Sequence, residues 1–77
     1  MAMKKYDVTI NYVVIDNENE TKELFIGRKT LTTFLKKGSK EFKELVEVAV
    51  MEYMDDVEES LCDTELAQFK SYLVVEA

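Results

Sequence analysis

The chain has 77 residues and a formal net charge of −6, with 47% hydrophobic and 34% charged residues. This composition indicates one small folded domain and excludes a disordered chain, although a domain of this size buries only about 60% of its unfolded surface. No apolar run approaches the length of a membrane span, and the first residues, MAMKKYDVT, lack the apolar core of a signal peptide. Because the single cysteine, Cys62, excludes an internal disulfide, we expect a cytoplasmic protein in which this thiol is buried and inert.

Residues 4–16 show the two-residue period of a half-buried strand. Val13 and Ile15 break this period, so the far end of the strand is either covered on both faces or carries a bulge. The residues of the predicted inner face are Tyr6, Val8, Ile10, Tyr12 and Val14.

A second strand is predicted over residues 21–31, after the polar turn of residues 17–20, and the two strands should form an antiparallel hairpin. Leu24 and Ile26 share one face of this strand. Gly27 indicates either a bulge or a close approach of another part of the chain. Residues 32–37 are expected to form one helical turn that ends at Gly38.

The most regular segment is residues 39–62, which we predict to be one long amphipathic helix with Ser39 as its N-cap. Its apolar residues fill an arc of roughly half the circumference at 100° per residue. This predicted core arc contains Phe42, Leu45, Val46, Ala49, Val50, Tyr53, Met54, Val57 and Leu61.

The end of the chain allows two interpretations. Residues 69–75 are aromatic and β-branched enough for a third strand, whereas residues 65–68 could instead begin a second helix. A hairpin alone is marginally stable, which favours the strand. The predicted fold is therefore a single α+β domain in the antiparallel order β-β-α-β, with β-β-α-α as the alternative.

Charge is distributed unevenly along the chain. Residues 1–43 carry a net charge of +3 and residues 44–77 a net charge of −9. From residue 52 to residue 65, seven acids fall within fourteen residues, or one per roughly 3 Å if helical, close to the spacing of about 3.4 Å along a DNA strand. The predicted outer face carries Glu44, Glu47, Glu52, Asp55, Glu58 and Glu59, with Val48 and Met51 among them.

This outer face favours a protein-binding role. A surface built for solubility alone would interleave lysines to gain pairs four residues apart, although an acidic face can also serve only to keep a protein in solution. Val48 and Met51 would supply apolar contacts inside the charged rim of an interface. So acidic a chain is not expected to bind a nucleic-acid backbone directly, nor a membrane.

The sequence offers little for catalysis or for metal binding. It has no histidine, and its two glycines cannot form a phosphate-binding loop. The acidic turn after residue 15 has Thr21 and Gly27 where a calcium loop requires glycine and glutamate. We therefore expect neither an enzyme nor a bound metal or cofactor.

Two resemblances agree with a binding role. In size, acidity and predicted elements, the chain resembles the small phage-encoded inhibitors of host enzymes, including anti-CRISPR proteins. The residues Tyr6-Asp7-Val8-Thr9, the acidic turn of residues 16–20 and the segment Leu31-Thr32-Thr33-Phe34 are similar to the uracil-DNA glycosylase inhibitors of Bacillus phages. The long acidic helix has no counterpart in those inhibitors. The resemblance implies a phage-derived inhibitor that mimics DNA, often as a dimer.

The sequence thus predicts a small inhibitor or regulator that binds a basic, nucleic-acid-binding surface of a host protein, such as a Cas nuclease or a DNA glycosylase. The alternative is a homodimeric structural or accessory protein, in which Val48, Met51 and an edge strand form the self-interface and the acids only solubilise it.

Overall fold

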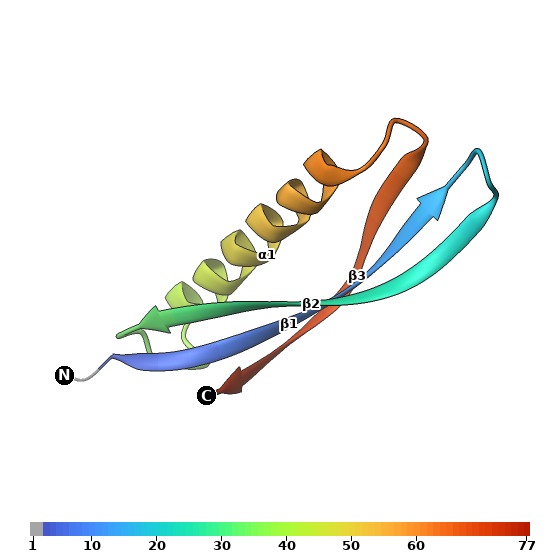
Figure 1. Ribbon diagram of the computed structural model, residues 1–77. Coiled ribbons are helices and arrows are strands. Elements are labelled where there is room, and N and C mark those ends of the chain that lie inside the picture. The colour runs from blue at the N-terminus through green and yellow to red at the C-terminus, as the bar shows by residue number, and fades with distance from the viewer. Residues whose placement is uncertain (1–2) are drawn as a thin grey trace.

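A computed structural model describes residues 3–77. Met1 and Ala2, the first two residues of the N-terminal segment that lacks the features of a signal peptide, lie outside the described residues. The chain forms strand β1 (Lys4–Asp16), strand β2 (Thr21–Thr33), helix α1 (Lys40–Ser60) and strand β3 (Glu65–Glu76). The strands make one antiparallel sheet in the order β2-β1-β3, and α1 lies along one face of it (Figure 1). The predicted order β-β-α-β is confirmed, and the alternative with a second helix is wrong.

The core lies between α1 and the central strand β1. Side chains at alternate positions of β1, from Tyr6 to Tyr12, are buried beneath the helix. The predicted inner face of β1 is confirmed. The predicted core arc of the helix is also confirmed, because its nine members are all buried or half-buried: Phe42, Leu45, Val46, Ala49, Val50, Tyr53, Met54, Val57 and Leu61.

Residues next to each end of α1 determine where the helix begins and ends. The hydroxyl of Ser39 accepts a hydrogen bond from the Phe42 backbone N–H at 3.2 Å, which satisfies a free donor of the first turn. The helix ends at Ser60, two residues before the predicted end, because Leu61 adopts an extended backbone. Glu65 then accepts a hydrogen bond from the Cys62 N–H at 3.0 Å and begins β3.

The helical turn predicted for residues 32–37 is wrong. Strand β2 continues to Thr33, because Thr32 and Thr33 pair with the start of β1, and the hydroxyl of Thr33 accepts a hydrogen bond from the Leu35 N–H at 3.1 Å. The chain then turns into the helix through Gly38, whose positive φ of 95° suits glycine.

Gly27 is a point of close approach and not a bulge. The pairing of β1 with β2 runs without interruption past Gly27, and a side chain at this position would collide with the phenol ring of Tyr53 on α1. The bulge lies instead in β3, where the pairing with β1 shifts by one residue at Lys70. Val13, which breaks the pattern of β1, is buried on the opposite face of the sheet from the helix.

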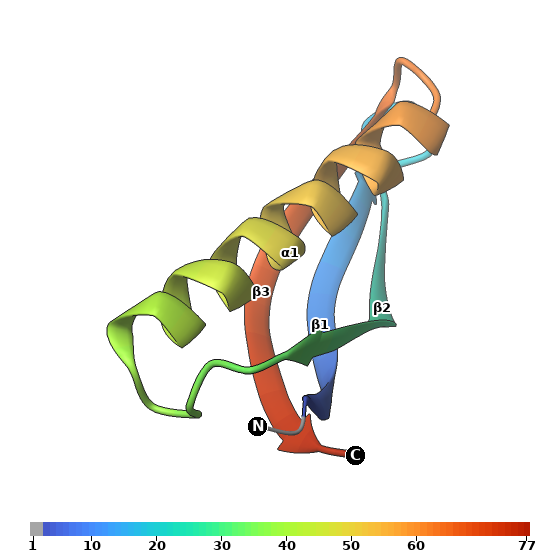
Figure 2. The same cartoon turned by 90° about the vertical axis from the view of Figure 1, so that its left-hand side faces the viewer.

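That opposite face, which we name the open sheet face, is not covered by any element in residues 3–77 (Figures 1 and 2). Since register partners point to the same side, it carries Val13 and Ile15 at the hairpin end of β1 and five exposed apolar side chains on the flanking strands β2 and β3. These are Leu24, Ile26, Leu66, Leu73 and Val75, each more than half exposed.

Candidate protein-binding face of the helix

The residues of the predicted outer face all lie on the solvent side of α1, and we name them the acidic helix face. Each of its six carboxylates belongs to an exposed residue. From residue 44 to residue 59 the helix carries seven acids over about 22 Å, one per roughly 3 Å; they are the six of the acidic helix face and Asp56, which is exposed but is not part of that face. The density of acidic residues predicted from the sequence is therefore found within the helix. Glu65, the last acid counted in that prediction, belongs to β3 and accepts a hydrogen bond in the turn after the helix.

One member of the acidic helix face is partly neutralised. The Lys29 ammonium of β2 lies 3.3 Å from the Glu52 carboxylate. This pair turns Glu52 toward the sheet, a detail that sequence analysis did not predict. Within residues 3–77 no other carboxylate of the face has a lysine or arginine within salt-bridge distance.

The two apolar residues of the acidic helix face are exposed as the sequence predicts. Val48 is 51% and Met51 is 65% exposed. Met51 lies at the edge of a groove of about 460 Å³ between α1 and β3, which we name the helix–β3 groove. Its lining residues are Glu47, Val50, Met51, Met54, Asp55, Phe69 and Tyr72.

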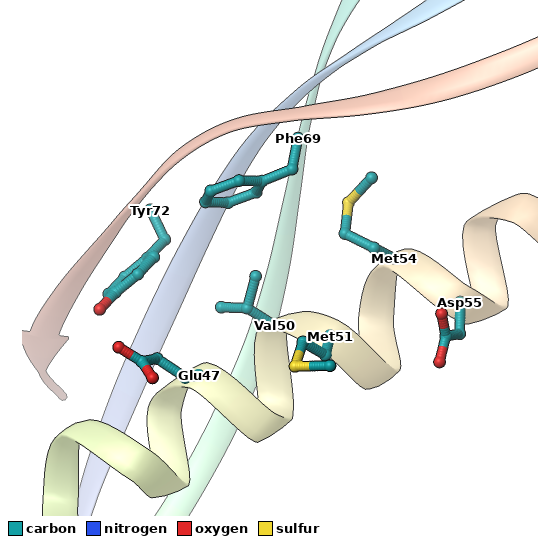
Figure 3. Close-up of a pocket in the computed structure, with 7 residues that line it drawn as sticks. All are labelled: Glu47, Val50, Met51, Met54, Asp55, Phe69 and Tyr72. Carbon is teal, nitrogen blue, oxygen red and sulfur yellow. The ribbon is translucent and has the colours of Figure 1, made fainter.

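The groove has an apolar floor and a carboxylate at each end. Phe69 and Tyr72 project from β3 toward Val50 on the helix, and Glu47 and Asp55 stand at opposite ends (Figure 3). These two acids are eight residues apart, so the groove follows the helix for about 12 Å. Such a site can accept an apolar side chain flanked by basic groups.

The structure therefore brings three of the predicted site residues together at the groove: Glu47, Met51 and Asp55. Glu44, Val48, Glu58 and Glu59 lie outside it on the same side of the helix, and Glu52 lies toward β2. Sequence analysis missed Phe69 and Tyr72. Being three residues apart, they can share a face of β3 because the bulge at Lys70 shifts the register between them, and no sequence signal marks that bulge.

Cys62 is exposed, so its predicted burial is wrong. Its thiol lies in the turn between α1 and β3, after the helix has left the core. A hydrogen bond with the Glu65 carboxylate is the main cause that raises the pKa of the Cys62 thiol, and the charges of Glu65, Asp16 and Asp63 act in the same direction. These acids disfavour the reactive thiolate.

Within residues 3–77, no group of three or more acidic or cysteine side chains is arranged to hold a metal ion. In the same part of the chain, no helix is long and apolar enough to cross a membrane.

Comparison of the chain with known protein families, with curated protein sequences and with solved structures found no match.

Proposed function

We propose that this chain is a small inhibitor or regulatory protein, of the kind that phages encode, which acts in the host cytoplasm on a nucleic-acid-processing protein. The acidic helix face occupies the basic groove in which that protein binds nucleic acid. The target class includes Cas nucleases and DNA glycosylases.

The observation that carries this proposal is the acidic helix face itself. Its carboxylates are exposed and, together with Asp56, lie along the helix axis about as densely as phosphates along a DNA strand, and a single lysine in residues 3–77 balances them. Like charges this close repel one another and lower the stability of the helix. A basic partner surface would remove that repulsion on binding and would be steered to the face over long range.

The helix–β3 groove adds the apolar part of the interface. Specific interfaces place apolar contacts inside a polar rim. Met51 at the groove edge, between Glu47 and Asp55, offers this arrangement. An arginine or lysine of the partner could lay its aliphatic stem along the groove while its charged head meets a carboxylate.

A capture experiment with matched variants tests the proposal. The variant Asp55→Asn/Glu58→Gln/Glu59→Gln removes three charges from the acidic helix face. The control Glu18→Gln/Glu20→Gln/Glu23→Gln removes three exposed charges at the far end of the β1–β2 hairpin, so both variants have a net charge of −3.

Immobilised wild-type and control proteins should capture a nucleic-acid-binding protein from host extract, identified by mass spectrometry. The helix variant should capture it at least tenfold less, because exposed charge contacts are lost at the interface itself. Equal capture by the two variants would show that overall charge, and not the helix, is responsible. Capture only of proteins that do not bind nucleic acid would contradict the proposal.

A further inference from the structure

The open sheet face has more exposed apolar surface than a solvated sheet face normally carries. Leu24 and Ile26 are 69% and 70% exposed, and Leu66 and Leu73 are 54% and 62% exposed. In an antiparallel sheet with one wet face, these positions are usually polar. The apolar residues gather near the hairpin end, where Leu66 pairs with Ile15 and Leu24 with Val13, and they continue along β3 to Leu73 and Val75, beside the polar Thr9 and Asp7 of β1.

The chain also buries little surface by itself. Its accessible surface is 5632 Å², against about 4,900 Å² for a compact protein of its mass. Its radius of gyration is 14.5 Å, against about 11.5 Å for a compact domain of this length. A three-stranded sheet with a helix on one side has only half of its sheet in a core. The fold itself therefore benefits from a second covering layer.

We propose that the open sheet face binds a second copy of this chain, so that two sheets pack face to face in a symmetric dimer with the acidic helices on the outside. A layer that stabilises the fold must be present whenever the chain folds, and a second copy always is. Two like faces form a closed two-fold interface, which ends assembly at the dimer.

The area of the face fits this occupant. Eleven rows of β1, from Tyr6 to Asp16, pair on both sides, which gives about 36 Å of length and about 14 Å of width at standard strand spacings. Two such faces bury on the order of 1,000 Å² in projection, the lower limit for a specific interface. Face-to-face packing of sheets at about 10 Å separation is a common arrangement.

The other surfaces are less suited to self-association. Two copies meeting through Val48 and Met51 would bring the carboxylates of the acidic helix face together. The free edge of β2 carries four charged side chains, and that of β3 is interrupted by the bulge at Lys70, two features that disfavour pairing between sheet edges. The open sheet face, in contrast, carries charges of both signs, among them Asp7 and Arg28.

Sedimentation equilibrium with a matched pair of variants tests the dimer. Leu24→Lys/Ile26→Lys places two charges on the open sheet face, and Val48→Lys/Met51→Lys places two on the helix. The wild-type protein and the helix variant should sediment with twice the 9.0 kDa chain mass. The sheet variant should sediment as a monomer at concentrations where the wild-type protein is dimeric.

A wild-type mass of 9.0 kDa at every concentration, or a dimer that survives Leu24→Lys/Ile26→Lys, would overturn the inference. A second measurement keeps the test decisive if the sheet variant does not fold. The thermal midpoint of the wild-type protein should rise with protein concentration, because folding is then linked to association. A midpoint independent of concentration would overturn the inference as well. Neither result depends on the partner of the acidic helix face.

Discussion

Gly27 allows α1 to lie close to β2. Its missing side chain leaves the space that the phenol ring of Tyr53 occupies. We predict that Gly27→Ala lowers the free energy of unfolding by about 1–3 kcal/mol, the usual cost of overpacking a filled site. Urea denaturation measures this change.

The hydroxyl and two ring carbons of Tyr53 are the atoms nearest to the added methyl group, so Tyr53→Leu, which removes the ring, should recover part of the loss in the double variant. Equal destabilisation by Gly27→Ala in the two backgrounds would show that the contact with the Tyr53 ring is not the cause.

Asp16 organises the turn between β1 and β2. Its carboxylate accepts hydrogen bonds from the side chain of Asn19 at 2.9 Å and from the backbone N–H groups of Glu18 and Asn19. The side-chain hydrogen bond from Asn19 is the largest of the causes that hold the pKa of Asp16 below its ordinary value of 3.8. The charged carboxylate is thus favoured in the folded state.

The lowered pKa of Asp16 determines the pH range in which its carboxylate stabilises the fold. Its contribution to stability is complete above the unfolded pKa of 3.8 and is lost as the pH falls through the lower pKa of the folded state. Asp16→Asn should therefore destabilise the protein more at about pH 7 than at about pH 2.5. Glu18→Gln, whose side chain accepts none of these bonds, is the control. A destabilisation by Asp16→Asn that is the same at both pH values would contradict this account.

At the scale of the elements, Ser39 fixes where α1 begins. We predict that Ser39→Ala lowers the free energy of unfolding by about 1 kcal/mol, because the Phe42 N–H loses its acceptor. Ser60→Ala, at the other end of the helix, removes only a bond to the Val57 carbonyl and is the matched control. Equal losses in the two variants, measured by urea denaturation, would argue against a capping role.

Periodicity in the sequence predicted the elements well, because a strand or helix with one buried face must repeat its apolar residues at the period of that element. The bounds of β1 and the core arc of α1 follow from this rule. The extension of β2 to Thr33 does not, because it depends on pairing with Lys4 and Lys5 across the sheet. The local preference of residues 32–37 for a helical turn is weaker than this pairing between strands.

The candidate site was predicted only in part for the same reason. Helical spacing places Glu47, Met51 and Asp55 on one side of α1 without any knowledge of the sheet. The floor of the groove needs the position of β3, and it needs the bulge at Lys70 that puts Phe69 and Tyr72 on one face. Likewise, the exposure of Leu24 and Ile26 follows from which face of the sheet the helix covers, and alternation alone does not show this.

At the scale of the whole molecule, two surfaces of opposite character lie on opposite sides. The acidic helix face is charged and remote from the open sheet face, so a dimer through the sheets leaves both helices free for partners. Two acidic faces on one particle would raise the apparent affinity for a target with two basic sites. Binding of a partner through an acidic helix face should weaken steeply with salt, since exposed charges are screened within about 10 Å at 0.1 M ionic strength.

The central claim is that the acidic helix face takes the place of nucleic acid on its partner. The most direct test is a titration of the partner–protein complex with a double-stranded oligonucleotide, followed by fluorescence anisotropy of the labelled protein. We predict that the oligonucleotide displaces the wild-type protein and the control Glu18→Gln/Glu20→Gln/Glu23→Gln competitively, and that Asp55→Asn/Glu58→Gln/Glu59→Gln is displaced at a far lower oligonucleotide concentration. Simultaneous binding of oligonucleotide and wild-type protein to the partner would contradict the account.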